Sequence, residues 1–499
     1  MEATGGYSVV NSNLAHKLDN ENTIDVETND IPLKWCSVSL SDVIFRGKRL
    51  EASVFDVEAI QALALINNGK YKTVPLYGDQ GIVNKAHYGS RLKRNYVTPE
   101  HENSIGFISS SEMLDIYPRP VKFMVDGEKV HDLHVKEGTV LLSRSGTIGN
   151  VTFVNKTLSK FLVSEHAIRL ECTDNSGYVY TFLKTKIGKK LVCSNIYGAV
   201  IQQIEPAHLT MVPVPDAPKE IKERIHNLIV ESFKLRDESN ELIDQATALL
   251  IDELKLPSIS EFKQNNIKNS ANVNAFNVKL SNLAGRVDAS YHLPIVDAIV
   301  NHLRKYAEEV TTVGDERISS DIILPGRFKR VYVDEGFGRV FIGGKQLWEL
   351  DPTNKKYLSL THHGDRISKQ LELHENMTLI TCSGTIGKVA LVGKHWENWT
   401  ANQHIIRVVP ADLNIAGYLN IFLSSDYGNV LIRRFTYGSV VDEIDNNHVS
   451  QIAIPLLKNK DVQKQINDFA LEANQKRYKA YKLEQQALDI MDNEVIFAK

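Results

Sequence analysis

Hydrophobic residues recur every seven positions between Lys219 and Leu256. The repeat consists of Ile221, Leu228, Leu235, Leu242, Leu249 and Leu256, with Ile225 and Ala246 at the second position of a heptad. No proline or glycine interrupts this segment, which lies between Pro218 and Pro257. At 1.5 Å per residue, a helix over the segment would be about 57 Å long. So long and narrow an apolar stripe predicts a coiled coil with a partner helix.

The end of the chain, from Asp461 to Ile490, carries a second pattern of the same kind. Its apolar positions are Val462, Ile466, Phe469, Ala473, Ala480, Leu483, Ala487 and Ile490, and Lys476 interrupts them. Three of these positions are alanine, which lets two helix backbones approach closely. Two helices of similar length, one central and one terminal, predict an antiparallel pair.

The rest of the chain is a duplication with a period of roughly 237 residues. The longer matching blocks are R-L-E-A-S-V (49–54) with R-V-D-A-S-Y (286–291), R-L-K-R-N-Y-V (91–97) with R-F-K-R-V-Y-V (327–333), and S-G-T-I-G at both 145–149 and 383–387. The shorter matches are Glu165-His166 with Gln403-His404, Arg169 with Arg407, and Tyr197-Gly198 with Tyr437-Gly438. Because all these blocks keep the same order, chance resemblance is excluded.

Each copy is expected to be a β-rich domain followed by one long helix. Short apolar strands enter and leave the S-G-T-I-G turn, whose glycines permit a tight reversal. The strands are expected at 139–143, 151–154, 378–382 and 389–392, and helices at 177–191 and 417–431.

The predicted fold class is α+β, with two pseudo-repeated β-rich domains separated by a pair of long antiparallel coiled-coil helices. The segments are a loose tail at 1–32, a first domain at 33–215, a central helix at 216–257, an Asn- and Ser-rich linker at 258–274, a second domain at 275–456 and a terminal helix at 457–499. The two domains are expected at opposite ends of the helix pair, held at a fixed distance.

The amino-acid composition indicates the cellular compartment and the kind of partner to expect. The chain has 499 residues, 42% of them hydrophobic, and a net charge of −3. It contains no apolar run of membrane-spanning length and begins with a polar stretch unlike a signal peptide. Its four cysteines form no C-x-x-C pair, which favours a reducing cytoplasm and argues against a zinc or disulfide framework. With so little net charge, any nucleic-acid contact must come from local basic clusters.

The ordered, doubled blocks and the helix after each copy resemble the specificity subunit of type I restriction–modification systems. The resemblance covers nearly the whole chain beyond the tail. The terminal helix departs from it, because its seam is weaker and richer in alanine. A second departure is the residue before each S-G-T-I-G turn, which is Arg144 in one copy and Cys382 in the other.

This resemblance implies two target-recognition domains, each reading one half of a split, asymmetric sequence in double-stranded DNA. It implies that the helices act as a spacer and dock two adenine-DNA methyltransferase subunits, which nuclease–translocase subunits can join in antiviral defence. The chain itself would be non-catalytic and hold no cofactor, and the S-adenosylmethionine for DNA methylation would sit in the partner. The setting would be the prokaryotic cytoplasm, without a membrane.

The candidate DNA-binding residues are the basic residues of the second repeated block, Arg91, Lys93, Arg94, Arg327, Lys329 and Arg330. Each set could neutralise phosphates, and an arginine could bond guanine O6 and N7 in the major groove. An equally open alternative is a solvated surface strand.

The S-G-T-I-G turns also have two open readings: a backbone nest for phosphate, or a tight hairpin with a packed isoleucine. The residues concerned are Ser145, Gly146, Thr147, Ser383, Gly384 and Thr385. His166 and His404 lack convergent metal ligands, so a hydrogen-bonded structural role is favoured and no metal site is expected. The stretches Glu58–Lys85 and Glu308–Ser320 differ between the copies and are expected to carry the sequence choice.

Two other classes of function compete with DNA recognition. One is a scaffold that binds only proteins through its two domains and helical spacer. The other is a self-contained methyltransferase or nuclease, against which stands the absence of an N-P-P-Y or D-P-P-Y stretch.

Overall fold

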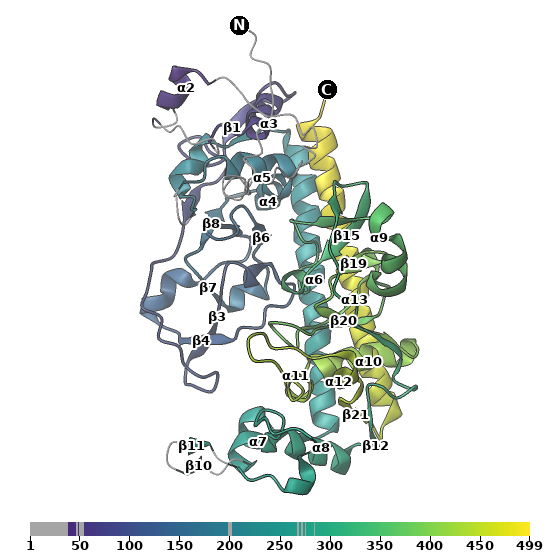
Figure 1. Cartoon of the computed structure of the whole chain (residues 1–499). Coiled ribbons are helices and arrows are strands. Elements are labelled where there is room, and N and C mark those ends of the chain that lie inside the picture. The colour runs from purple at the N-terminus through teal and green to yellow at the C-terminus, as the bar shows by residue number, and fades with distance from the viewer. Residues whose placement is uncertain are drawn as a thin grey trace, which may run out of the picture.

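The computed structural model describes residues 38–45, 48, 54–197, 202–266, 269–270, 273–274, 276–283 and 285–499. The expected tail at 1–32, residues 49–53 of the first repeated block, and Gly198 lie outside these residues. The described part contains two lobes on either side of a central pair of long helices (Figure 1). This mixed architecture confirms the predicted fold class.

The two long helices are α6 (Lys219–Glu253) and α13 (Lys460–Ile490), which lie side by side (Figure 1). They run antiparallel, since Arg224 near the start of α6 pairs with Glu494, just beyond α13. Further along α6, Ser232 Oγ donates to the carbonyl of Ala480 at 2.8 Å. With 35 residues, α6 spans about 52 Å.

The seam between these helices does not follow the leucine row that the sequence suggested. Leu228, Leu235, Leu242 and Leu249 are only half-buried. The buried row is Ile225, Ile229, Ser232, Arg236, Ser239, Ile243, Ala246 and Leu250, again with heptad spacing. The leucines were assigned to the seam wrongly because the centre of the actual seam is polar. A search for apolar residues does not detect such positions.

A carboxylate sits at the centre of the polar seam. Glu484 of α13 is fully buried and accepts hydrogen bonds from Arg236 of α6, from Lys184 and, at 2.8 Å, from the hydroxyl of Tyr180. These two cations hold the pKa of Glu484 at about 2, against the opposing effect of burial. The charged cluster therefore joins both helices and the first lobe at one point.

The two lobes have the same sheet topology. A four-stranded sheet has the order β2-β8-β5-β6 in the first lobe and β13-β20-β17-β18 in the second. These strands are β2 (Lys85–His87), β5 (Val140–Ser143), β6 (Val151–Phe153), β8 (Ala167–Glu171), β13 (Ser319–Ile323), β17 (Thr378–Thr381), β18 (Val389–Leu391) and β20 (Ile405–Pro410). The duplication read from the sequence is thus a duplication of fold.

Two further sheets of each lobe repeat as well. A second sheet has the order β4-β3-β7 in the first lobe and β14-β16-β15-β19 in the second, and a two-stranded sheet pairs β1 with β9 and β12 with β21. The strands are β1 (Thr73–Pro75), β3 (Ser104–Ile108), β4 (Lys122–Val125), β7 (Leu162–Val163), β9 (Pro213–Pro215), β12 (Glu309–Thr312), β14 (Tyr332–Val333), β15 (Gly338–Ile342), β16 (Lys356–Ser359), β19 (Thr400–Ala401) and β21 (Ala453–Leu456).

A buried arginine ties the sheets of each lobe together. Arg169 on β8 donates to the carbonyls of Leu133, Val163, Ser164 and Ala167. Its counterpart Arg407 on β20 donates in the same way to Leu371, Ala401, Asn402 and Ile405. Since Val163 and Ala401 belong to the second sheet of their lobes, each guanidinium fixes one sheet against the other.

Each lobe has two consecutive short helices where the sequence suggested one, and the first of the two packs on the helix pair. In the first lobe these are α4 (Ser176–Lys184) and α5 (Lys186–Cys193), and in the second α10 (Leu413–Ser424) and α11 (Asp426–Arg433). The breaks fall at Thr185 and Ser425, whose hydroxyls accept from the amides of Gly188 and Gly428. These side-chain caps start a new helix, which apolar periodicity does not reveal.

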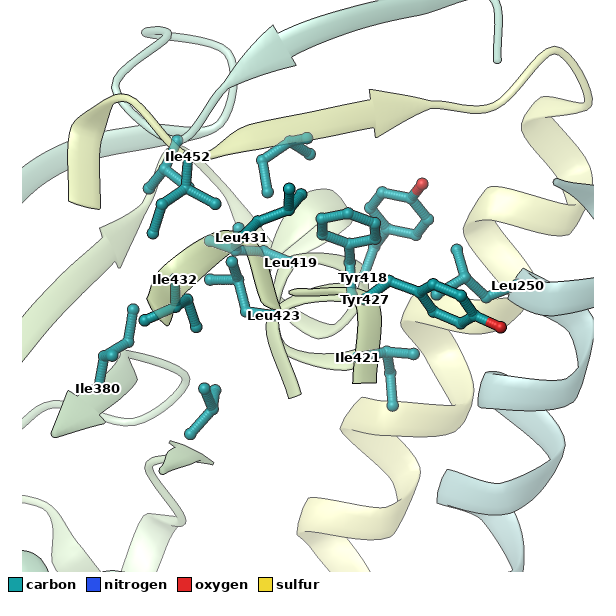
Figure 2. Packing of buried hydrophobic residues seen from close by; sticks show 14 of the residues in the cluster. Leu250, Ile380, Tyr418, Leu419, Ile421, Leu423, Tyr427, Leu431, Ile432 and Ile452 are labelled. Carbon is teal, nitrogen blue, oxygen red and sulfur yellow. The ribbon is translucent and has the colours of Figure 1, made fainter. Parts of the chain in front are cut away.

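The core of the second lobe is continuous with the helix pair (Figure 2). Leu250 of α6 lies at one side of this core and Ile380 of β17 at the other, with side chains of α10 and α11 between them. Gly417 is required where α10 crosses α13, because a Cβ there would come within 2.3 Å of the Asn467 carbonyl oxygen. Gly177 plays the same part where α4 crosses α6.

The remaining helices are peripheral, and one lies in the expected linker. Residues 259–266 form α7 (Ile259–Asn266) because Phe262 is buried against His302 and Tyr427, with ring centroids 5.4 and 6.2 Å away. The β10 (Asn269–Ser270) and β11 (Val273–Asn274) strands follow. The others are α2 (Leu40–Phe45), α3 (Val57–Asn67), α8 (Pro294–Tyr306), α9 (Leu360–Arg366) and α12 (Asn446–Ser450). Among the described helices, none is both long and apolar enough to cross a membrane.

The lobes are attached toward opposite ends of the antiparallel helices, as expected, but they also contact each other. Although α4 contacts the first half of α6 and α10 the first half of α13, the far parts of the lobes meet in the middle. Asp115 and Glu349 form an isolated antiparallel bridge, and the Ile116 amide donates to the Trp348 carbonyl at 2.8 Å.

Two carboxyl groups at this meeting point should make stability depend on pH. Burial raises the pKa of both Asp115 and Glu349 to about 7, although Lys388 acts in the opposite direction on each. Glu112 and Glu349 raise the pKa of Asp115 further. For Glu349, Asp351 raises the pKa further, whereas Lys184 and Lys189 lower it. The folded chain therefore holds protons that the unfolded chain has released, so stability falls as pH rises from about 4 to 7.

We expect the free energy of unfolding, measured with urea, to be lower at pH 8 than at pH 6. Asp115→Asn removes one of the two titrating groups and should reduce this difference. Asp468→Asn is the matched control, because Asp468 lies on exposed helix surface beside Lys464. An Asp115→Asn protein with an unchanged pH profile would contradict the assignment.

Candidate nucleic-acid interface

Each S-G-T-I-G segment is a rigid hairpin turn. The Ser143 hydroxyl donates to the Thr147 carbonyl at 2.6 Å and accepts from the Asn150 amide at 2.9 Å. Thr381 makes the same two bonds, at the same distances, to Thr385 and Lys388. The first glycines have φ of 75° and 73°, in the left-handed region that favours glycine. These bonds are those of a tight hairpin, whose exposed tip residues are Gly146, Thr147, Gly384 and Thr385.

The arginine-bearing segment of the first lobe lies beside its turn. Arg94 donates to both oxygens of Glu165 at 2.8 and 2.9 Å, and its guanidinium lies 5.1 Å from the ring centroid of Phe107. Arg94 is therefore committed to holding Glu165. Arg91 and Lys93 are exposed and lie outside any regular strand.

The second lobe repeats this arrangement with a different partner. Arg330 donates to Gln403 Oε1 at 2.8 Å and lies 5.5 Å from the ring centroid of Phe341. Arg327 is 80% exposed and donates to Glu443 at 2.9 Å, while Lys329 is exposed. Of the six basic residues proposed from the sequence, Arg94, Arg327 and Arg330 thus bond a neighbouring side chain, and Arg91, Lys93, Arg327 and Lys329 are exposed.

An open cleft of about 510 Å³ brings two of the second-lobe candidates, Arg327 and Ser383, together. Arg327, Ser383, Gln403, His404 and Glu443 line it, and a smaller pocket of about 230 Å³ continues it toward Tyr437. Ser383 from the turn and Arg327 from the basic block, far apart in sequence, share one surface. The Gly384 amide donates to the Asp442 carbonyl at 3.0 Å, which fixes the turn against the cleft wall.

The two histidines belong to these surfaces as neutral, hydrogen-bonded groups. His166 Nδ1 lies 2.6 Å from the Ser145 hydroxyl, and His404 Nε2 lies 3.2 Å from the Gln403 amide nitrogen. Burial lowers the pKa of both imidazoles, and the neighbouring Arg94 and Arg330 lower them further. Both rings are half-buried, and the described residues contain no group of three ligands placed to hold a metal.

The sequence reasoning missed the loop that closes the second-lobe cleft. Val440 is 94% exposed and Val441 49%, both at the rim of the cleft beside Glu443. The signal was present, because Y-G-A-V-I at 197–201 matches Y-G-S-V-V at 437–441. The first-lobe residues 198–201 lie outside the described residues.

Equivalent positions of the two surfaces carry unlike side chains. Glu165 in the first lobe corresponds to Gln403 in the second, Arg144 to Cys382, and Gln203 to Glu443. Arg144 is buried beneath Tyr88 at 4.0 Å from its ring centroid and pairs with Glu205. A carboxylate accepts hydrogen bonds only, whereas an amide both donates and accepts. The two lobes therefore present one scaffold with two different hydrogen-bonding patterns.

The stretches expected to carry the sequence choice lie elsewhere. Residues 58–85 contribute most of α3 and β1, and residues 308–320 contain β12 and the start of β13. Because β1 and β12 make equivalent pairs with β9 and β21, next to the long helices, their placement favours a framework role.

No family model matches the chain, and no curated protein matches it. Among solved structures, the chain is similar to the type I restriction–modification S subunit from M. genitalium, at 13% identity and TM-score 0.28, covering 84% of this chain and 97% of that one. It is also similar to the HsdS subunit from Thermoanaerobacter tengcongensis, at 12% identity and TM-score 0.26, covering 84% and 98%.

A third similar structure comes from work on complex assembly and conformational transition of the type I restriction–modification system. It matches at 13% identity and TM-score 0.27, covering 86% of this chain and 97% of that one. Identities and TM-scores this low describe a loose likeness of fold, and the roles of individual residues depend on the geometry of this chain.

Proposed function

We propose that this chain is a specificity subunit of a type I restriction–modification complex, which reads a split, asymmetric site in double-stranded DNA. Each lobe reads one half-site with the surface beside its S-G-T-I-G turn. The helix pair separates the two surfaces.

The observation that carries this proposal is one scaffold presented twice with unlike chemistry. Both surfaces expose cations, Arg91 and Lys93 on one and Arg327 and Lys329 on the other, which suits two stretches of phosphate backbone. Between the copies, Glu165 is replaced by Gln403, so that Arg94 and Arg330 are held by different partners beside the two turns. Two copies of one reader with different side chains suit two different half-sites.

The chain supplies recognition, and the chemistry belongs to partners. In this proposal two adenine-DNA methyltransferase subunits, with their S-adenosylmethionine, dock on the helix pair, and nuclease–translocase subunits join them. The complex acts in the cytoplasm in defence against foreign DNA.

Methylated-base sequencing of the genome, with and without this gene, tests the proposal directly. We expect one bipartite adenine-methylated motif to disappear when the gene is deleted and to return with the full chain. Exchanging residues 54–175 for the equivalent part of another recognition lobe should change one half of the motif only. An unchanged methylome would overturn the proposal, and a protein-binding scaffold would give that result.

Arg327→Ala should weaken DNA binding by about tenfold, because one exposed guanidinium next to the cleft is lost. If Arg327 contacts phosphate, the slope of log affinity against log salt should also fall by about one, for all sequences alike. If it contacts a base, only sites with that base should be affected. Fluorescence anisotropy over a salt series measures both quantities.

Lys479→Ala is the matched control for this variant. It removes one positive charge from an exposed position on α13, within the helix pair, and should leave the affinity within about twofold. Equal losses from both variants would mean that net charge, and not the cleft, governs binding.

A further inference from the structure

The two lobes contact each other directly at two places. The first is the Asp115–Glu349 bridge, where Arg119 of the first lobe also donates to the Ser424 carbonyl and lies 5.9 Å from the Trp348 ring centroid. It surrounds a small cavity of about 60 Å³ whose walls include Ile243 of α6 and Arg477 of α13. We call this set of contacts the central bridge.

The second place joins the first lobe to an outer loop of the second. Lys189 of α5 donates to Asn354 at 2.8 Å and to Asn150 of its own lobe at 2.9 Å, and Thr353 reaches the same Asn150 at 3.2 Å. Lys186 pairs with Glu335. We call these contacts the side bridge.

The two bridges are related by the internal symmetry of the chain. Asn150 of the side bridge and Lys388 beside the central bridge follow the S-G-T-I-G turns at equivalent positions. Ser424 at the end of α10 corresponds to Lys184 at the end of α4, next to Lys186. The outer part of each lobe thus docks where the turn and the short helices of the other lobe meet. Such a self-complementary contact is what a two-fold interface requires.

We infer that these lobe-to-lobe bridges, together with the helix pair, set the spacing between the two half-sites that the protein accepts. The inference rests on the proposed function. The specificity-determining residues for spacing are then Ile116, Arg119 and Lys186 in the first lobe, with their partners in the second.

The geometry of DNA explains why a direct bridge matters. One extra base pair moves a half-site by about 3.4 Å along the axis and about 35° around it. A lobe that contacts only the helices could follow such a shift by rocking on α6, where its outer contacts to Glu241 and Asp244 are exposed. A lobe that is also hydrogen-bonded through its backbone to the other lobe cannot move alone. The bridges therefore convert two independent readers into one rigid reader of fixed span.

Two variants open the bridges in different ways. Arg119→Ala with Lys186→Glu truncates one side chain of the central bridge and reverses one charge of the side bridge, and adding Glu335→Lys restores the exposed ion pair. Ile116→Pro deletes the amide that donates to Trp348, and the preceding Asp115 is already extended, at φ −67° and ψ 138°, as a residue before proline should be. Hydrogen exchange at the Ile116 amide in the first variant reports opening without any DNA.

The test selects from a pool of random-sequence duplexes with the tagged full chain, isolated from its own cells with any attached subunits. Sequencing of the bound duplexes gives the distribution of spacer lengths. We expect the wild type to enrich one spacer, and both variants to keep the same half-sites but to lose most of their preference, by tenfold or more, over spacers one base pair shorter or longer. Restoration of the ion pair should recover part of the preference.

The possible failures are distinguishable. A wild type that enriches no bipartite site overturns the proposed function and the spacing inference together. A wild type and variants that all enrich one spacer equally overturn only the inference, since Ile116→Pro cannot form the bridge bond whatever the state of the other contacts. Loss of folding would appear as loss of both half-sites and of the unfolding transition.

Discussion

Glu484→Gln should lower the free energy of unfolding by about 3 to 5 kcal/mol, because it leaves two buried cations without their counter-charge. Glu484 is fully buried, and both Lys184 and Arg236 are within hydrogen-bonding distance of its carboxylate. Glutamine keeps the size and one acceptor but removes the charge. Urea unfolding at pH 7 measures the loss.

The pH dependence gives an independent check on the same residue. Since the folded-state pKa of Glu484 is about 2, below its ordinary value, its contribution is present above pH 4.5 and disappears as pH falls toward 2. The difference between wild type and Glu484→Gln should therefore shrink in acid. A triple variant, Glu484→Gln with Lys184→Met and Arg236→Met, should regain much of the stability, because apolar groups of similar volume can replace a buried ion cluster.

Asp468→Asn is the matched control for Glu484→Gln. It removes an acidic charge from α13 at an exposed pair with Lys464, and should change stability by less than about 0.5 kcal/mol. If Glu484→Gln cost no more than this control, the charged cluster would not be a stabilising element.

Arg407→Met should destabilise the second lobe by about 3 to 5 kcal/mol, since four carbonyls would lose a charged donor. Arg407 is completely buried, and its bonds to Ile405 and Leu371 are 2.6 and 3.2 Å long. Burial lowers the pKa of the guanidinium to about 9, so part of the gain is offset by desolvation. Urea unfolding followed by hydrogen exchange should place the loss in β19 and β20 and not in the first lobe.

Arg169→Met should give the mirror result, with faster exchange confined to β7 and β8 of the first lobe. Arg433→Met, at an exposed position on α11, is the control for both and should cost less than about 0.5 kcal/mol. If exchange became faster in both lobes alike, each arginine would not be stabilising the sheets of its own lobe independently.

The duplication and the two long helices could be predicted from the sequence because both leave a periodic record. Seven-residue spacing marked α6 and α13, and the paired S-G-T-I-G blocks marked equivalent hairpins. The seam was misplaced because Ser232, Arg236 and Ser239 occupy positions where a hydrophobic pattern expects leucine. Polar seam residues are recognisable only when the opposing Glu484 and Ala480 are known.

The candidate site was predicted in part. The sequence identified the basic blocks and the turns, and the structure brings Arg327 and Ser383 together on one cleft. It gave no sign that Arg94 and Arg330 support their neighbours, because Glu165 and Gln403 lie some seventy positions further along the chain. The contact between the lobes was also invisible, since Asp115 and Trp348 belong to stretches without any repeated motif.

The charged cluster around Glu484 also bears on how the first lobe could be exchanged for another. Tyr180 and Lys184 belong to the first lobe, yet they neutralise a carboxylate of the terminal helix. An imported lobe that lacked this tyrosine and lysine would leave the buried Glu484 carboxylate without two of its hydrogen-bond donors. Recombination between β8, which ends at Glu171, and Tyr180 would leave the charge balance within the recipient gene. A chimaera made by exchanging the first lobe should therefore be most stable when its junction lies within this short window.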